Sequence, residues 1–266
     1  FPLYAPDATL CGAEPRFYPC LFENEFVPLI ETLESLVDEN TKVILYNFPS
    51  NPTGATITIA QRDELLDFAR RHDLWIISDE VYDRIIYGSE HVSFLGTGYN
   101  KHLLVNSFSK TFAMTGWRIG YIISTNLEAM QQLVKLQYYV TACSNDAMQY
   151  AVLEAFEQAN DYPAQMTEEF QARRDLICER LNAMPGVSCH VPEGAFYVFP
   201  KVEVPGMNSE EVAIELLKGG VLCSPGSAFG ESGEGHLRFA YTIGREDISR
   251  GMDMVADVLN KLRDGA

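Results

Sequence analysis

The residues of this chain with the clearest chemical potential surround a lysine. Lys110 follows Ser107 and Ser109 and is followed by Arg118. The apolar run at 102–106 predicts a short buried strand, so the lysine is expected near the carboxyl end of a strand. Open α/β sheets usually bind their ligands at that end. An amine, two hydroxyls and a guanidinium this close together suit an anion that carries a reactive carbonyl.

Pyridoxal phosphate (PLP) is an anion of this kind. A lysine can form a Schiff base with its aldehyde, while arginine and serine side chains bind its phosphate. Most lysines at strand ends merely face water, so the interpretation of Lys110 depends on other segments of the chain.

Three other segments place polar residues where a structural role explains them poorly. Asn51 lies in a loop with prolines and a glycine, which account for a stiff turn but not for the asparagine. Asp79 directly follows the apolar strand predicted at 74–78, where a carboxylate is costly without a positive partner. Arg238 lies inside the apolar run at 236–241, which is unusual without an anionic partner.

Together these segments resemble the class I and II aminotransferases, which are PLP enzymes of fold type I. The resemblance rests on the tetrad Asn51-Pro-Thr-Gly54, the strand end Asp79-Glu-Val-Tyr82, the block from Ser107 to Arg118, and Arg238. It covers the whole chain and is closest to bacterial aspartate-, aromatic- and alanine-type enzymes. It implies an α/β fold with a mainly parallel sheet, flanking helices and a smaller C-terminal α+β domain.

The resemblance assigns the catalytic roles to Lys110, Asp79 and Tyr82. The lysine would form the Schiff base with pyridoxal 5'-phosphate and carry a proton during the reaction. The aspartate would keep the pyridine nitrogen protonated, and Tyr82 and Asn51 would contact the cofactor's O3′. The expected reaction is a ping-pong exchange of an amino group between an α-amino acid and an α-keto acid.

Binding roles follow from the same resemblance. Ser107, Ser109 and Arg118 are expected to bind the phosphate, because a planar guanidinium suits a phosphate dianion. Phe1 takes the place of the aromatic residue that stacks on the cofactor ring in the family. Arg238, with Asn51, is expected to bind the α-carboxylate of the substrate.

The family pattern makes further suggestions about loops near this site. It suggests a cis peptide between Asn51 and Pro52. The segments 194–197 and 224–226 resemble stretches near the substrate entrance and receive no catalytic role. Glu80 is expected to point away from Asp79 and to be structural.

Other functions fit the same motifs. The C–S β-lyases and the aminocyclopropane-carboxylate synthases share the lysine block, so the block cannot separate them from aminotransferases. The context from Ala113 to Arg118 favours transamination. A third interpretation is not an enzyme, because some transcription regulators carry an aminotransferase-like effector domain.

Composition narrows the class of protein. The chain has 266 residues, 47% of them hydrophobic, which is enough for a substantial core and two domains. Its net charge of −17 argues against binding to nucleic acid or anionic lipid. No apolar run reaches membrane-spanning length, and the N-terminus lacks a signal-like segment. The dispersed cysteines and histidines predict a cytoplasmic protein without a metal site.

Alternating strand and helix patterns predict a large PLP-binding domain over residues 1–160. A long helix at 161–184 begins a second domain that continues to residue 266. Further helices are expected at 26–37, 58–72, 126–139, 145–158, 209–218 and 245–263. Strands are expected at 42–46, 74–78, 102–106, 188–191, 196–199, 221–223 and 236–241, and those of the large sheet should be buried on both faces.

Against the family pattern the chain begins late, without a counterpart of the N-terminal arm or the glycine-rich phosphate loop. We therefore expect these 266 residues alone to be poorly active. As in the family, a homodimer with shared active sites is expected. A dicarboxylic substrate needs a second cation, and the segment 133–142 contains no arginine. Aspartate, alanine, aromatic and branched amino acids all stay open as substrates.

Overall fold

A computed structural model describes residues 1–159 and 161–264, which form two compact units. One comprises Val37–Pro49 and Thr56–Thr167 and is called the lysine unit, after Lys110. The other comprises Phe1–Leu36, Ser50–Ala55 and Glu168–Ala266 and is called the arginine unit, after Arg238. Both units combine segments that are distant in the sequence. The domain division at residue 160 stays a prediction, because the units follow contacts rather than chain order.

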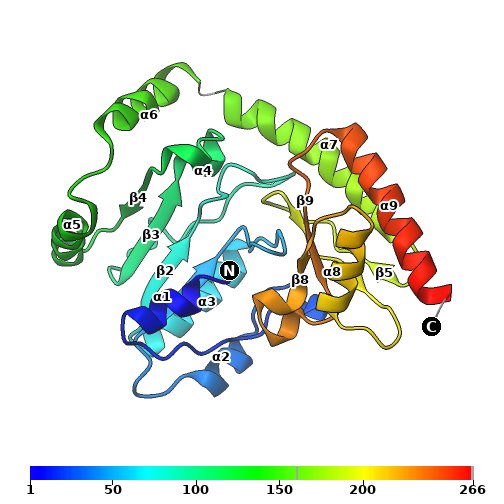
Figure 1. Cartoon of the computed structure of the whole chain (residues 1–266). Coiled ribbons are helices and arrows are strands. Elements are labelled where there is room, and N and C mark those ends of the chain that lie inside the picture. Colours follow the sequence, from blue (N-terminus) through cyan, green and yellow to red (C-terminus); the bar gives the residue numbers. More distant parts are fainter. Residues whose placement is uncertain (160, 265–266) are drawn as a thin grey trace. The chain divides into compact units, whose positions relative to one another are not determined.

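The lysine unit is built on a four-stranded sheet (Figure 1). Its strands are β1 (Val43–Asn47), β2 (Trp75–Asp79), β3 (His102–Ser107) and β4 (Gly120–Ile123), in that spatial order. The first three are parallel, whereas β4 runs antiparallel to β3. The predicted mainly parallel sheet is confirmed, and the strands predicted at 42–46, 74–78 and 102–106 lie within one residue of β1, β2 and β3.

The prediction that these strands are buried on both faces is wrong. In β2, Ile76 and Ser78 are fully buried, whereas Trp75 and Ile77 are only half-buried. The same alternation runs through β1 and β3. Successive side chains of a strand point to opposite faces. An unbroken apolar run therefore shows that both faces tolerate burial, but not how fully each is covered.

The helices predicted at 58–72, 126–139 and 145–158 each begin at an N-cap residue. Thr58 and Gln61 form a capping box at the start of α3 (Ile59–Arg71), which satisfies backbone N–H groups that would otherwise lack acceptors. Asn126 caps α5 (Leu127–Thr141), and Asn145 caps α6 (Asp146–Gln158). The one-turn helix α4 (Phe108–Thr111) follows β3 directly and is followed by the 3-10 helix η2 (Thr115–Trp117).

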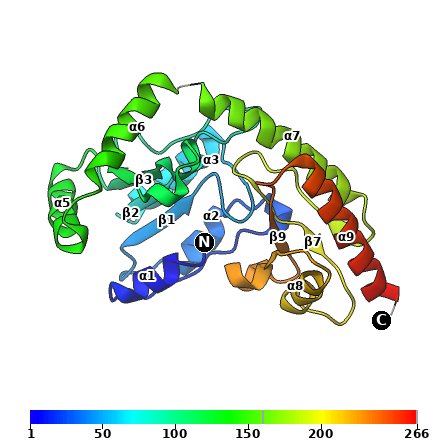
Figure 2. The same cartoon turned by 45° about the horizontal axis from the view of Figure 1, so that its top comes forward.

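The arginine unit combines helices with two small sheets. In one sheet β5 (Val187–Ser188) pairs with β7 (Lys201–Val202); in the other, β9 (Leu237–Ala240) lies between β6 (Tyr197–Val198) and β8 (Ser224–Pro225). Its helices are α1 (Tyr4–Leu10), η1 (Phe22–Asn24), α2 (Ile30–Leu36), α7 (Tyr162–Asn182, shared with the lysine unit), α8 (Ser209–Lys218), η3 (Gly226–Phe229), η4 (Glu231–Gly233) and α9 (Arg245–Asp264). Figure 2 shows α9 running along α7, to which the ion pair between Arg180 and Asp253 joins it.

Several predicted boundaries in the arginine unit need correction. The helix predicted at 26–37 begins only at Ile30, because Phe26 has a positive φ of 62° that a right-handed helix excludes. The strand predicted at 221–223 lies instead at Ser224–Pro225, and the strand predicted at 188–191 ends at Ser188. Strands this short depend on pairing with distant partners, which local sequence does not specify.

The loop that contains Asn51 also departs from expectation. The cis peptide lies between Phe48 and Pro49, so the prediction of a cis bond before Pro52 is wrong. Any X-Pro bond prefers trans only weakly, and the surrounding structure selects the isomer. Gly54 is required in this loop, because its φ is 70° and an added Cβ would lie 2.3 Å from Cβ of Pro192.

Two surveys of the described residues bear on function. Within residues 1–159 and 161–264, no helix combines the length and apolar character needed to span a bilayer. Nor do three or more histidine, cysteine, aspartate or glutamate side chains in this part of the chain gather as they would around a metal ion.

Candidate active site

Lys110 lies in the short helix that caps the carboxyl end of β3. Ser107 forms the N-cap of α4: its Oγ accepts a hydrogen bond from the Ser109 backbone N–H at 3.1 Å and donates one to the Ile119 carbonyl at 3.1 Å. The hydroxyl thus ties the start of the helix to the returning chain before β4. The N-cap explains why the chain turns into a helix here.

The environment of Lys110 favours its neutral form. The side chain is half-buried, and its Nζ lies 5.9 Å from the ring centre of Tyr82, which is itself only 3% exposed. Burial lowers the pKa of Lys110 below its ordinary value of 10.5, and the positive charge of Arg118 lowers that pKa further. A lysine with a lowered pKa is a better nucleophile and base near neutral pH.

Arg118 stays near the lysine because its own loop is braced. It follows η2 in the left-handed conformation, with a φ of 55°, and its Nη1 donates to the Thr115 carbonyl at 2.8 Å. The Thr115 hydroxyl in turn donates to the Ser109 carbonyl at 3.1 Å. The guanidinium is exposed, so it can reach an anion from solvent.

Asp79 ends β2, one strand away from the lysine segment. Its Oδ1 accepts from the Val81 backbone N–H at 3.2 Å, and its carbonyl accepts from Asn47 Nδ2 at 3.0 Å. The parallel register pairs Asp79 with Val105, close to the end of β3. Asp79 and Lys110 therefore belong to the same edge of the sheet.

Glu80 serves the fold, as expected. It is 3% exposed, and its carboxylate accepts from the Ser78 hydroxyl at 2.8 Å and pairs with His91 Nε2 at 2.7 Å. Burial by itself raises the pKa of Glu80, but hydrogen bonds with His91, Ser93 and Ser78 outweigh it and lower the pKa. These hydrogen bonds hold the segment after β2 in place from its buried side.

A further carboxylate near the lysine helix, which is only partly buried, was not predicted. Burial raises the pKa of Asp83, against an opposing hydrogen bond with Asn106, and its Oδ1 accepts no hydrogen bond. Asn106 Oδ1 accepts from the Ser107 N–H at 2.7 Å, so these two residues help to fix the start of α4. The signal in the sequence was an asparagine inside an apolar strand.

Arg238 is the centre of a second cluster, in the arginine unit. Its Nη1 donates to Oδ1 of the buried Asn51 at 2.9 Å, and its Nη2 donates to Oγ of Ser224 at 3.0 Å. Two predicted site residues, Asn51 and Arg238, are thus in direct contact. Ser224 belongs to the segment 224–226, which the family pattern had placed near the substrate entrance without giving it a role.

Two aromatic rings complete this cluster, and sequence reasoning missed both. The guanidinium carbon of Arg238 lies 4.9 Å from the ring centre of Tyr197 and 4.9 Å from that of Phe229. Cation–π contacts at such distances are attractive. Tyr197 belongs to a segment that the family pattern had placed near the substrate entrance, which was the available signal.

The predicted site residues divide between the two units. The lysine unit contains Asp79, Tyr82, Ser107, Ser109, Lys110 and Arg118, and the arginine unit contains Phe1, Asn51 and Arg238. Phe1 is 45% exposed and packs edge-on against Tyr4, with ring centres 5.5 Å apart. Its role toward a cofactor stays a prediction.

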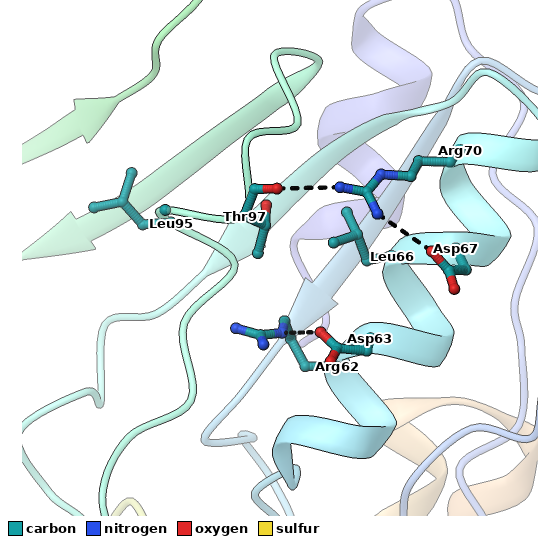
Figure 3. Close-up of a pocket in the computed structure, with 8 residues that line it drawn as sticks. Arg62, Asp63, Leu66, Asp67, Arg70, Leu95 and Thr97 are labelled. Atoms are coloured by element: carbon teal, nitrogen blue, oxygen red, sulfur yellow. Dashed lines mark hydrogen bonds and ion pairs between the residues drawn. The ribbon is translucent and has the colours of Figure 1, made fainter.

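A shallow groove of about 380 Å³ lies elsewhere on the lysine unit, between α3 and residues 95–97 (Figure 3). Its two arginines are already engaged. Arg62 pairs with Asp63 at 2.7 Å, and Arg70 pairs with Asp67 at 3.3 Å while donating to the Thr97 carbonyl at 3.1 Å. These bonds attach a loop to α3, so the groove is structural.

Comparison with known proteins decides the family. The profile described as aminotransferase class I and II matches residues 1–255. This chain belongs to the class I and II aminotransferases. The aromatic-amino-acid aminotransferase 2 of Thermococcus litoralis is 37% identical to it over 98% of this chain and 68% of its own length. The aspartate aminotransferase of Pyrococcus abyssi is 39% identical, with the same coverage of both chains.

Solved structures confirm the predicted PLP fold type I for this aminotransferase. An aromatic aminotransferase from Pyrococcus horikoshii matches with a TM-score of 0.93 and 37% identity, covering 98% of this chain and 71% of that one. An aspartate aminotransferase from Thermus thermophilus, solved with maleate, matches with a TM-score of 0.92 and 31% identity, covering 97% and 67%. The protein is an enzyme that transfers amino groups, in a family that depends on PLP.

Proposed function

We propose that this aminotransferase uses Lys110 to exchange amino groups between an α-amino acid and an α-keto acid by a ping-pong mechanism. The observation that carries the proposal is the half-buried Lys110 amine at the end of β3, with its pKa lowered by burial and by Arg118. A lysine that served only as a surface charge would gain nothing from such an environment.

The residues of the lysine unit fit PLP as a cofactor. The exposed guanidinium of Arg118 and the hydroxyl of Ser109 supply donors for a phosphate close to the lysine amine, and the Ser107 hydroxyl would join them by giving up its hydrogen bond to the Ile119 carbonyl. Asp79 ends the neighbouring strand and supplies a carboxylate for a protonated pyridine nitrogen. The groups that would bind the phosphate and the pyridine nitrogen of PLP are therefore present at one sheet edge. Phe1 is proposed to stack on the ring.

When bound, PLP supplies an aldehyde for covalent attachment of amines and a ring that accepts the electrons of the substrate Cα–H bond. Lys110 would remove the proton from the Cα of the amino donor in one half-reaction, for which a neutral amine is needed, and would deliver a proton to the Cα of the product amino acid in the other. The negative charge of the Asp79 carboxylate would favour the protonated form of the pyridine nitrogen. The buried Tyr82 and Asn51 are proposed to donate hydrogen bonds to the cofactor's O3′.

Arg238 is proposed to bind the substrate α-carboxylate. Its guanidinium is held by Asn51 and Ser224 yet stays partly exposed. A planar fork of N–H donors binds a carboxylate in two parallel hydrogen bonds, which orients the Cα–H bond for proton removal. Since relatives are named aspartate and aromatic-amino-acid aminotransferases, we propose acidic or aromatic amino acids as donors.

We further propose that the enzyme is a homodimer with shared active sites. Helix α5 buries none of its residues and exposes Val134, Leu136, Tyr138, Tyr139 and Val140, each by more than half. Apolar side chains gathered on one helix in this way indicate an interaction surface.

We also propose that residues 1–160 and 161–266 act as a PLP domain and a smaller domain. A cytoplasmic location is proposed from the free cysteines among the described residues.

The test is the absorbance spectrum of the full-length protein with PLP, before and after single amino acids are added. Conversion of the bound cofactor to the spectrum of pyridoxamine phosphate, with release of a keto acid, supports transamination and names the donor. Pyruvate and ammonia from cystathionine would favour a C–S lyase instead. A PLP-dependent change in DNA affinity without conversion would favour a regulator.

A further inference from the structure

We infer that Ser224, Tyr197 and Phe229 are positioning residues that hold the Arg238 guanidinium in one orientation for a substrate carboxylate. The inference rests on the proposed role of Arg238 in binding that carboxylate. It concerns only the arginine unit, in which all four residues lie.

The three-stranded sheet places these neighbours on both sides of Arg238. In the antiparallel register of β8 and β9, Ser224 lies directly opposite Arg238. On the other side, Tyr197 of β6 lies opposite Ala240, two residues along β9 and so on the same face as Arg238. Phe229 ends η3, the 3-10 helix that follows β8. The topology β6-β9-β8 therefore surrounds one side chain with partners from three segments.

The hydrogen bonds fix the rotation of the guanidinium while leaving donors for a ligand. Asn51 Oδ1 takes one hydrogen of Nη1, and Ser224 Oγ takes one hydrogen of Nη2. Each of these terminal nitrogens carries a second hydrogen. Because a hydrogen bond holds each of the two terminal nitrogens, their second hydrogens are already oriented toward a carboxylate. Less side-chain conformational entropy is then lost when the carboxylate binds.

The aromatic rings hold the guanidinium without competing for those donors. Both ring centres lie 4.9 Å from Cζ of Arg238, and Tyr197 is 8% exposed. Phe229 is itself held from behind, since its ring meets that of Phe199 edge-on with centres 5.8 Å apart. The ring faces attract the cation but accept no conventional hydrogen bond, so ligand binding at the edge of the guanidinium is preserved.

The experiment compares variants that remove each restraint with variants that keep it. Phe229→Leu removes a ring and Phe229→Tyr keeps it; Ser224→Ala removes the hydroxyl and Ser224→Thr keeps it. In the PLP-loaded full-length protein, the Kd of maleate and of 3-phenylpropionate is measured by calorimetry, together with the KM and kcat of the amino donor and the Kd of PLP. Arg238→Ala shows that the carboxylates bind through Arg238.

We expect Phe229→Leu and Ser224→Ala to raise the Kd and KM about threefold to tenfold, the effect of one cation–π contact or one typical net intramolecular hydrogen bond. The matched variants stay within about twofold of the parent, and kcat and the Kd of PLP change little in all four. Tyr197→Leu should behave like Phe229→Leu.

Unchanged carboxylate affinity in Phe229→Leu and Ser224→Ala would overturn the inference. So would equal losses in the matched variants, or a parallel loss of PLP binding, since either indicates a general structural role. Failure of the proposed function is distinguishable. A parent protein that binds carboxylates through Arg238 but never converts its cofactor would refute transamination and still allow the Kd comparison.

Discussion

The two cationic clusters of this aminotransferase are built in opposite ways. Lys110 lies on a one-turn helix at the end of a parallel strand, half-buried, with a second cation, Arg118, close by. Arg238 lies in the middle of an antiparallel strand, hydrogen-bonded by Asn51 and Ser224 and packed against two rings.

This difference fits the roles proposed for the two cations. An amine that acts as nucleophile and base must give up its proton, so burial and a neighbouring positive charge help it. A guanidinium that binds a carboxylate must keep its charge and its direction, so hydrogen-bond acceptors and π faces help it. The same protein therefore destabilises one cation and restrains the other.

The largest effect is expected at the lysine. Lys110→Ala removes the amine that carries the Cα proton, so amino transfer should fall by at least about 10²–10⁴-fold, the contribution of a general acid–base group. The measurement is the rate of cofactor conversion after rapid mixing with the amino donor.

Lys261→Ala is the matched control for that change, because Lys261 is an exposed lysine of α9 and belongs to neither cluster. It should leave the rate unchanged. Retention of the parental rate by Lys110→Ala would break the comparison, because the lysine cluster would then have no chemical role.

The next largest effect is expected at the arginine, and in binding rather than in proton transfer. Arg238→Ala should raise the KM of the amino donor about 10- to 100-fold, because it removes charge-assisted hydrogen bonds to the carboxylate. Arg238→Lys should recover little, since an ammonium cannot supply the planar fork. Steady-state kinetics and carboxylate titration measure both.

Arg250→Ala serves as the control, because its side chain is 73% exposed. If Arg238→Ala changed the titration of Lys110 instead of the KM, the division of labour between the clusters would be disproved.

A smaller effect is expected on the stability of the lysine unit. Glu80→Gln breaks the buried pair with His91, and should lower the free energy of unfolding by about 1–3 kcal/mol at neutral pH. The pKa of Glu80 is held below its ordinary value of 4.5. Its contribution is therefore present above that value and is lost as the pH falls below it. Urea unfolding at several pH values measures this dependence.

In the same unit, Glu64→Gln on the exposed face of α3 is the matched control and should have almost no effect. Equal acid sensitivity of the parent and Glu80→Gln would show that the network around Glu80 does not stabilise the folded state.

The smallest effect is expected from Arg118→Gln. Removing the positive charge of Arg118, the second cause of the lowered Lys110 pKa, should shift the titration of Lys110 to higher pH. The pH dependence of the reaction of Lys110 with an amine-reactive reagent in the PLP-free protein measures this shift. The lowered pKa of Lys110 also makes the stability of the folded protein depend on pH. Between the lowered pKa and 10.5, the unfolded chain binds more protons, so the unfavourable contribution of Lys110 is relieved as the pH rises through that window. A titration that Arg118→Gln leaves unmoved would remove Arg118 from the lysine cluster.

Much of this protein could be read from local sequence signals. The helix starts predicted at residues 58, 126 and 145 were correct, and in the structure Thr58, Asn126 and Asn145 each accept a hydrogen bond from a backbone group only three residues away. The apolar runs predicted β1, β2 and β3 to within a residue. Arg238 was singled out because a cation in an apolar strand requires a partner. The family and fold were expected from the resemblance of these segments to the class I and II aminotransferases, and both are confirmed.

The sequence by itself determined which groups are candidates for chemistry, because a lysine, an aspartate and an arginine in unusual local settings are visible one segment at a time. Only the tertiary structure decided which residues surround these groups. It selected the cis bond before Pro49, the register that places Ser224 opposite Arg238, and the packing of Tyr197 and Phe229 around that side chain. Such choices sum many weak contacts between segments far apart in the chain, and no single segment encodes them.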